Sequence, residues 1–208
     1  MTPFVLGIAG GSGTGKSTLA FALMDKYPEQ ISILHFDDYQ KVGEEIPLLH
    51  GFANWDHPEA VDFEKLVHDL NTLKNGEAIT VGTWCDERVN PNFAHTKKRV
   101  PMQIQPKALI LLEGYLTLYK LEVRELLDLM LYFDAPEEIR NQRRTKLRDE
   151  HYEEYNTKVL RPMHNQYLEP TKQYAHHVIN IIPFTKDELV LHVERMLPFL
   201  NKTGSTSS

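Results

Sequence analysis

The chain contains 208 residues, with a formal net charge of −6, 41% hydrophobic residues and 25% charged residues. This length and composition fit one α/β domain with a small subdomain or lid, and the acidic balance gives no support to a nucleic-acid partner. Cys85 is the only cysteine, which excludes an intrachain disulfide; no signal peptide or apolar run of ~20 residues is evident, so we expect a cytoplasmic protein without a membrane partner.

Apolar runs alternate with amphipathic segments along the chain, which predicts a three-layer α/β fold with a parallel sheet. Asp62 can cap one helix, and Thr185 with Glu188 has capping-box spacing for the closing helix. A small hairpin over 79–84 and 100–104 is expected beside the sheet. The predicted strands are 4–9, 31–36, 108–112, 129–133 and 177–182, and the predicted helices are 17–26, 63–73, 137–150 and 155–174, the last interrupted near Pro162 and Pro170.

Residues 10–17 read GGSGTGKS and match the phosphate-binding pattern G-x-x-x-x-G-K-[ST]. Glycines let successive backbone N–H groups turn around an anion, and the positive end of the following helix faces the same anion. Lys16 is expected to reach the β- and γ-phosphates and Ser17 to coordinate Mg²⁺. A chance glycine-rich turn is the alternative, but a strand before the loop and a helix after it argue against that. The predicted phosphate-binding residues are Gly10, Gly11, Ser12, Gly13, Thr14, Gly15, Lys16, Ser17 and Thr18.

Acidic residues follow two predicted strands at their carboxyl ends, where ligands bind in open α/β sheets. Glu113 is placed to reach the Mg²⁺ shell, unless it is a solvated acid. Asp37 and Asp38 end the second strand, and neighbouring strand residues point to opposite sides, so at most one faces the site. A kinase needs such a carboxylate to take the proton of the acceptor hydroxyl. The alternative is a turn-forming aspartate pair.

A basic cluster on the helix over 137–150 predicts a lid at about 137–155. Guanidinium groups match the negative charge that spreads over a transferring phosphate, and a lid also excludes water. The alternative is a solvated basic face compensated by the acids at 149–154. The cluster consists of Arg140, Arg143, Arg144, Lys146 and Arg148.

With these motifs the chain resembles the uridine kinase and phosphoribulokinase family of P-loop kinases, which includes nicotinamide riboside kinases. The resemblance implies a P-loop NTPase fold with a single kinase domain over 1–200 and a hairpin insertion at about 78–105. The polar residues after Leu200 predict a disordered tail over 201–208. The matching strings, in family order, are GGSGTGKST, FDDY, NWDHPEAVDF, AHTKKR, LLEGYL, RNQRRTKLRD and YLEPTKQYAHHVI.

The resemblance also implies residue roles. Asp37 would be the general base, and Asp56 would hold the ribose 2′- and 3′-hydroxyls, for which a carboxylate offers two acceptors. Arg144 would be the lid arginine that also reaches the sugar, Arg148 would contact the transferred phosphate, and His95 would bind a pyrimidine edge. Trp55 and Tyr39 complete the expected substrate-binding residues, with Trp84 as an alternative stacking partner.

The chain departs from the uridine kinase pattern at three places. Asn90 stands where an aromatic residue is usual, Phe36 where glutamine is common, and HYEEYNTKVLRPM replaces an arginine-glycine-arginine stretch and is more similar to nicotinamide riboside kinases. We therefore expect ATP- and Mg²⁺-dependent phosphorylation of a small ribonucleoside at its 5′-hydroxyl, with uridine or cytidine as acceptor. A nicotinamide riboside kinase and a non-catalytic nucleotide-binding regulator are the alternatives, and a homo-oligomer is left open.

Overall fold

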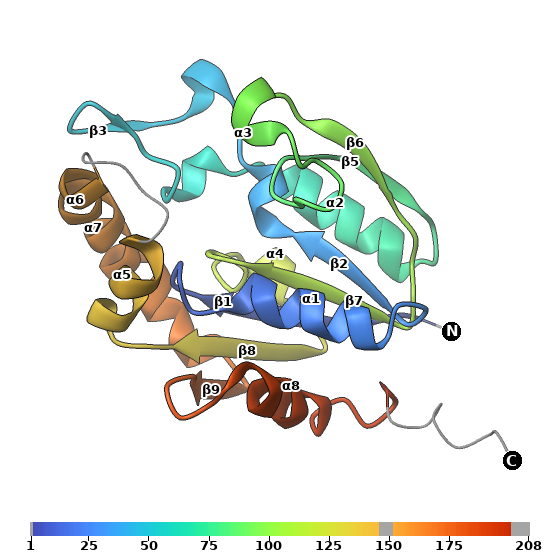
Figure 1. Cartoon of the computed structure of the whole chain (residues 1–208). Coiled ribbons are helices and arrows are strands. Elements are labelled where there is room, and N and C mark those ends of the chain that lie inside the picture. Colours follow the sequence, from blue (N-terminus) through green and yellow to red (C-terminus); the bar gives the residue numbers. More distant parts are fainter. Residues whose placement is uncertain (1, 146–151, 201–208) are drawn as a thin grey trace, which may run out of the picture.

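The computed structural model describes residues 2–145 and 152–200. At its centre lies a parallel five-stranded sheet in the order β2-β7-β1-β8-β9 (Figure 1). The inner strands are buried along nearly their whole length, as the continuous apolar runs predict. The predicted α/β fold is confirmed. The five strands are β1 (Phe4–Gly10), β2 (Ile31–His35), β7 (Leu109–Gly114), β8 (Leu129–Asp134) and β9 (His177–Asn180).

Helices cover both faces of the sheet, because alternate strand residues belong to two separate apolar clusters. On one face, Leu19 and Leu23 of α1 (Lys16–Lys26) and Val190 of α8 (Lys186–Glu194) pack on the sheet. On the other face, Leu66 and Leu70 of α2 (Phe63–Lys74) pack on the intervening strand residues. Three layers result, as predicted, with the short helix α4 (Leu121–Arg124) also beside the second face.

Local capping follows the sequence. The Asp62 side chain accepts a hydrogen bond from Lys65 N at 3.0 Å at the start of α2. Thr185 and Glu188 form the predicted capping box at the start of α8. Both contacts satisfy backbone donors that a helix start leaves unpaired, so they fix where these helices begin.

The insertion contains the predicted hairpin. Strands β5 (Ile79–Thr83) and β6 (Val100–Ile104) pair antiparallel, and the short helix α3 (Phe93–Thr96) lies in the connection between them. A second small pair, β3 (Leu48–Leu49) with β4 (Phe52–Ala53), lies in a segment for which no strand or helix was predicted.

The second strand ends one residue earlier than predicted, at His35. A 3₁₀ turn over Phe36–Tyr39 follows it, so both aspartates of the FDDY string lie on a turn and not on a strand. A 3₁₀ turn advances about 120° per residue. Two successive side chains still diverge, which preserves the expectation that only one of them faces the site.

The lid region begins with α5 (Glu137–Thr145) and resumes with α6 (Tyr152–Tyr155) and α7 (Arg161–Met163), with residues 146–151 outside the described part. The predicted interruptions near Pro162 and Pro170 do not break the helical path. Each proline instead follows a widened π-helical turn, Asn156–Leu160 and His164–Leu168 respectively. A proline ring clashes with the carbonyl four residues earlier in an α-helix, and the wider turn moves that carbonyl away.

Among the described residues, no helix combines the length and the apolar character that crossing a membrane requires.

Candidate active site

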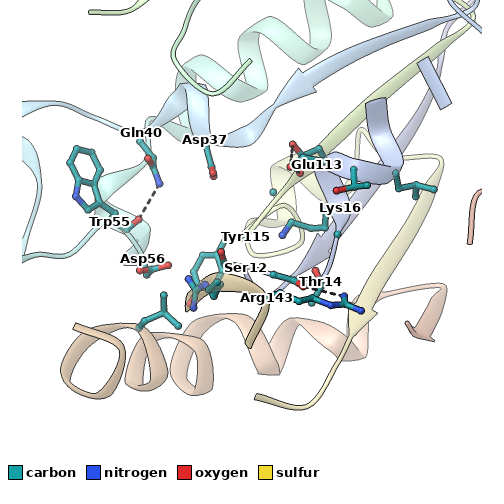
Figure 2. Close-up of a pocket in the computed structure, with 18 of the residues that line it drawn as sticks. Ser12, Thr14, Lys16, Asp37, Gln40, Trp55, Asp56, Glu113, Tyr115 and Arg143 are labelled. Atoms are coloured by element: carbon teal, nitrogen blue, oxygen red, sulfur yellow. Dashed lines mark hydrogen bonds between the residues drawn. The ribbon is translucent and has the colours of Figure 1, made fainter. Parts of the chain in front are cut away.

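A cavity of about 1560 Å³ lies at the carboxyl edge of the sheet, between the phosphate loop, the insertion and the lid. Pockets for one small ligand usually measure about 300–1000 Å³, so this cavity has room for two substrates side by side. Figure 2 shows Asp37 and Asp56 on one side of it and Lys16 and Glu113 on the other. A donor and an acceptor can therefore meet within one enclosure.

The phosphate loop forms the donor wall. Seven of its nine predicted residues, Ser12 to Thr18, line the cavity. Gly10 and Gly11 lie behind them, and their carbonyl oxygens accept hydrogen bonds from Lys16 Nζ at 2.9 and 3.3 Å. Burial lowers the pKa of Lys16, although Glu113 and Asp37 oppose that shift.

Gly13 explains why this loop needs glycine at that position. Its φ of 88° lies in the left-handed region, and an added Cβ would lie 2.7 Å from the carbonyl oxygen of Arg140. Any side chain there would push the loop away from α5 of the lid. The loop and the lid thus approach each other backbone to backbone.

Glu113 is held at the end of β7 by two neighbours. Ser17 Oγ donates to its carboxylate, at 3.1 Å from both oxygens, and His35 Nδ1 donates to Oε1 at 2.8 Å. Burial alone would raise the pKa of Glu113, but His35, Lys16 and Ser17 together lower it below its ordinary value. Burial likewise opposes protonation of His35, yet Asp86 and Glu113 raise its pKa to about 10.

The pair of Ser17 and Glu113 fits the predicted magnesium site. Mg²⁺ binds hard oxygen ligands and is usually held by one or two protein groups together with phosphate oxygens and waters. A hydroxyl and an ionised carboxylate in contact beside the phosphate loop provide that donor set. Within the described residues no group of three or more His, Cys, Asp or Glu could hold a metal by itself, so phosphates would complete the shell.

The two aspartates of the 3₁₀ turn have different environments. Asp37 lines the cavity, and burial, followed by the charge of Glu113, raises its pKa to about 6, against the opposing effect of Lys16. Asp38 is buried on the other side, where its Oδ1 accepts from Trp84 N at 2.8 Å. Asp37 alone is available to an acceptor hydroxyl, as the expectation of one facing carboxylate requires.

The lid arginines lie at different depths. Arg143 and Arg144 line the cavity, and Arg144 is only 5% exposed. Arg140 is 6% exposed and donates through Nε to Ala135 O at 3.1 Å, so it holds the base of the lid. Burial of Arg140 and Arg144 excludes a fully solvated basic face. Lys146 and Arg148 lie outside the described residues.

The acceptor side contains two further predicted residues, Trp55 and Asp56, which both line the cavity. Asp56 Oδ2 accepts a hydrogen bond from the hydroxyl of Tyr155 at 2.9 Å. Trp84 and Phe93 of the insertion also line this side, with ring centroids 5.3 Å apart. This side of the cavity thus presents aromatic faces and a carboxylate.

Two predicted substrate residues lie elsewhere. Tyr39 is 3% exposed and does not line the cavity, and its hydroxyl donates to Asp69 Oδ2 on α2 at 2.9 Å. It is the last residue of the 3₁₀ turn, which directs it into the core. His95 is exposed on α3 and is also absent from the cavity lining, because this short helix presents Phe93 there instead. Neither side chain therefore lines the cavity in which substrate contacts were expected.

Several cavity residues were not anticipated from the sequence. Tyr115 follows Glu113 after one glycine and lines the cavity beside Asp56 (Figure 2). At the donor end, residues of the loop after β9 and of α8 line the cavity: Ile181, Phe184, Thr185, Lys186 and Leu189. Their place after strands of the parallel sheet could have indicated them, because the loops that follow parallel strands meet at the ligand-binding edge of the sheet.

A parallel sheet with a phosphate loop between β1 and α1, a basic lid and a carboxylate across the same cavity defines a P-loop kinase. The chain belongs to the phosphoribulokinase / uridine kinase family, whose model matches residues 5–187. A uridine kinase of Halalkalibacterium halodurans is 37% identical over 187 residues, which cover 85% of each chain. Uridine kinases of Anoxybacillus flavithermus (37%; 85% of each chain) and Clostridium botulinum (36%; 85% of this chain, 87% of the relative) are similar.

Solved structures agree on the fold. The structure of a possible uridine kinase from Bacillus stearothermophilus has a TM-score of 0.64 and 22% identity, over 86% of this chain and 90% of that one. A shikimate kinase from Acinetobacter baumannii has a TM-score of 0.50 and 19% identity, over 97% and 96% of the two chains. At such identities these likenesses concern the fold alone.

Proposed function

We propose that this kinase transfers the γ-phosphate of ATP to the 5′-hydroxyl of a ribonucleoside, with uridine or cytidine as acceptor. The observation that carries the proposal is that Asp37 and the phosphate loop line opposite sides of one cavity, with Asp56 at its acceptor end. The uridine kinases that cover most of the chain support the same acceptor class. The absence of a guanine-reading N-K-x-D string argues against a GTPase.

Each side chain has a part in the transfer. Asp37 accepts the proton of the attacking hydroxyl, and its raised pKa makes it a better base than an exposed aspartate. Lys16 and Arg144 stabilise the negative charge that spreads over the transferring phosphate. A Mg²⁺ ion held by Ser17 and Glu113 would neutralise charge on the β- and γ-phosphates. The lid excludes water, the competing acceptor.

The ribose and the base would bind on the acceptor side. Asp56 offers two oxygens to the 2′- and 3′-hydroxyls, and Trp55, Trp84 and Phe93 offer aromatic faces to the base. Lys97 and Arg99 line the same side. Two cations there disfavour a positively charged pyridinium ring and favour a neutral pyrimidine, because like charges repel in a cavity of reduced dielectric.

A nicotinamide riboside kinase is the second candidate. The position of His95 outside the cavity favours it, since a pyrimidine edge then lacks the expected histidine partner. Aromatic faces together with Asp56 would also suit a cationic ring. Purified protein incubated with labelled ATP and equal concentrations of uridine, cytidine and nicotinamide riboside separates the two candidates by kcat/KM.

The decisive variant is Asp37→Asn. General-base catalysis contributes on the order of 10² or more, so kcat should fall at least that far while the variant remains folded. A loss of less than about tenfold in a folded variant would exclude Asp37 as the base. Tight ATP binding without transfer to any nucleoside, in the unmodified protein, would instead favour a non-catalytic regulator.

A further inference from the structure

A polar chain links the insertion to Glu113 through His35. His35 on β2 and Glu113 on β7 are register partners on adjacent parallel strands, so their side chains extend to the same face of the sheet. His35 is 2% exposed and Glu113 is 5% exposed. An ionised carboxylate can only accept, so His35 Nδ1 carries the hydrogen of their 2.8 Å contact. One ring nitrogen of His35 is therefore committed to Glu113.

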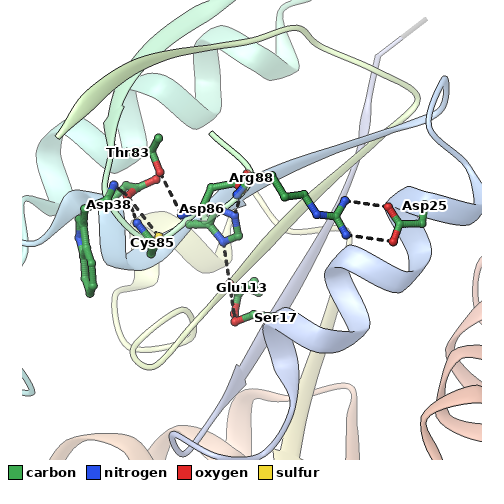
Figure 3. A network of polar contacts seen from close by, with 10 residues as sticks. Ser17, Asp25, Asp38, Thr83, Cys85, Asp86, Arg88 and Glu113 are labelled. Atoms are coloured by element: carbon green, nitrogen blue, oxygen red, sulfur yellow. Dashed lines mark hydrogen bonds and ion pairs between the residues drawn. The ribbon is translucent and has the colours of Figure 1, made fainter. Parts of the chain in front are cut away.

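The other ring nitrogen of His35 faces Asp86, in the connection between β5 and β6. His35 Nε2 lies 3.7 Å from Asp86 Oδ2 and makes no hydrogen bond within the described residues. Asp86 is 6% exposed, and its Oδ1 accepts a hydrogen bond from Arg88 N at 2.9 Å. This hydrogen bond holds the carboxylate against the turn to which Asp86 belongs. At 3.7 Å the contact between Asp86 and His35 is an electrostatic one. Figure 3 shows Asp86 beside Arg88, which pairs with Asp25.

Asp86 is not needed to attach the insertion. The same segment is held by a two-pronged ion pair from Arg88 to Asp25 on α1, at 2.7 and 2.9 Å. Asp38 binds the main chain of Trp84 at 2.8 Å, and Arg99 donates to Asp38 O at 2.8 Å. With these anchors in place, the distinct contribution of Asp86 is the buried negative charge that faces His35 Nε2.

We propose that Asp86 is a positioning residue which, through His35, fixes the carboxylate of Glu113 for metal–nucleotide binding. The proposal rests on the assignment of Glu113 to the Mg²⁺ shell made under the proposed function. Ligating carboxylates depend on the groups that orient them, and loss of such an outer group typically weakens metal binding by about 10–100-fold. Trp84, two residues before Asp86, lines the acceptor side and donates through Nε1 to Asp37 O at 2.8 Å. One turn of the insertion thus supports both the proposed base and the proposed metal-side carboxylate.

The test is the Mg²⁺ dependence of ATP binding, measured by calorimetry without any nucleoside. Asp86→Asn keeps the side-chain size and the acceptor for Arg88 N but removes the charge that faces His35. We expect the Mg²⁺ concentration for half-maximal ATP binding to rise at least about tenfold. The ATP affinity in EDTA should change less than about twofold. Asp25→Asn is the matched control, because it removes an exposed anchor of the same segment and should leave the Mg²⁺ dependence unchanged.

A second variant tests the route through the ring. His35→Asn keeps an N–H donor where Nδ1 lies but cannot reach Asp86, so it should match Asp86→Asn, and the double variant should add nothing to either. If Asp86→Asn fails to fold, the His35→Asn variant still tests the proposal. An unchanged Mg²⁺ dependence in the single variants, or fully additive effects, would overturn the proposal. If Asp86→Asn weakens Mg²⁺-dependent ATP binding in a protein that phosphorylates no nucleoside, this proposal stands and the proposed function fails.

Discussion

Tyr155 of the lid donates its hydroxyl to Asp56 Oδ2 at 2.9 Å, so a lid residue occupies an acceptor position that the ribose diol would use under the proposed function. A nucleoside must share or displace this hydrogen bond. Tyr155→Phe removes the competing hydroxyl and keeps the ring, and a hydrogen bond of this kind contributes about 1 kcal/mol. The KM for the nucleoside should therefore fall about two- to fivefold, as measured by steady-state kinetics at saturating ATP.

A substitution of Asp56, the partner of Tyr155, should change the nucleoside KM in the opposite direction. Asp56→Asn removes the charged acceptor itself, and its loss should raise the nucleoside KM by about tenfold or more, since charge-assisted hydrogen bonds are worth about 1.5–3 kcal/mol. A rise in KM with Tyr155→Phe would show that the hydroxyl binds the nucleoside and does not compete with it.

Asp37 predicts how activity depends on pH. Its pKa is raised to about 6, mainly by burial and by Glu113, and it must be ionised to accept a proton. The kcat/KM should be constant at neutral pH and fall tenfold per pH unit below about pH 6. This dependence of kcat/KM reports the ionisation of Asp37 in the free enzyme. A fall in kcat/KM that begins only near the ordinary aspartate pKa would contradict the assignment of Asp37, with its raised pKa, as the base.

The same shift predicts a stability effect with a definite sign. Because the folded-state pKa of Asp37 lies above its unfolded value, the folded state binds the proton more tightly, and stability falls as pH rises from the unfolded pKa to about 6. Asp37→Asn removes this ionisation. It should raise the melting temperature at pH 8 relative to the unmodified protein, and the gain should shrink at pH 5.

The elements predicted well from sequence are those whose backbone demands appear in the residue types. The glycines of the sequence indicate the phosphate loop. At Gly13 the reason is visible, because its φ of 88° and the nearby Arg140 carbonyl oxygen leave no room for a side chain. The buried strands appear as unbroken apolar runs, and the caps at Asp62 and Thr185 follow from single side-chain contacts. In each case a local interaction selects a local sequence.

The structure differs from the predictions where contacts between residues far apart in the chain decide which way a side chain points. Ending the second strand at His35 rather than at Phe36 directs Tyr39 into the core. The sixteen-residue connection between β5 and β6, residues 84–99, turns Phe93 inward and leaves His95 exposed. No pattern near Tyr115 or Tyr155 indicates that the fold brings both beside Asp56, because that meeting depends on how the lid packs against the sheet.

Tyr39 gives a direct test of its position in the core. Tyr39→Phe removes the hydroxyl that donates to Asp69 and leaves the packed ring in place. Asp69 keeps its contact with Lys65 Nζ at 2.6 Å, so the loss should be limited to about 1 kcal/mol of unfolding free energy. Urea denaturation measures that loss, while the nucleoside KM should stay within about twofold. A large KM change at unchanged stability would return Tyr39 to the substrate site.

The insertion offers a paired test of which residue meets the base. Phe93 lines the cavity against Trp84, whereas His95, two residues along the same short helix, is exposed. Phe93→Ala should raise the uridine KM about fivefold or more, because stacking on an aromatic face is worth about 1–3 kcal/mol per base. His95→Ala, made in the same helix as a control for local disturbance, should change that KM less than twofold. The reverse order of effects would require α3 to reorient when a nucleoside binds, and it would restore His95 as the partner of a pyrimidine edge.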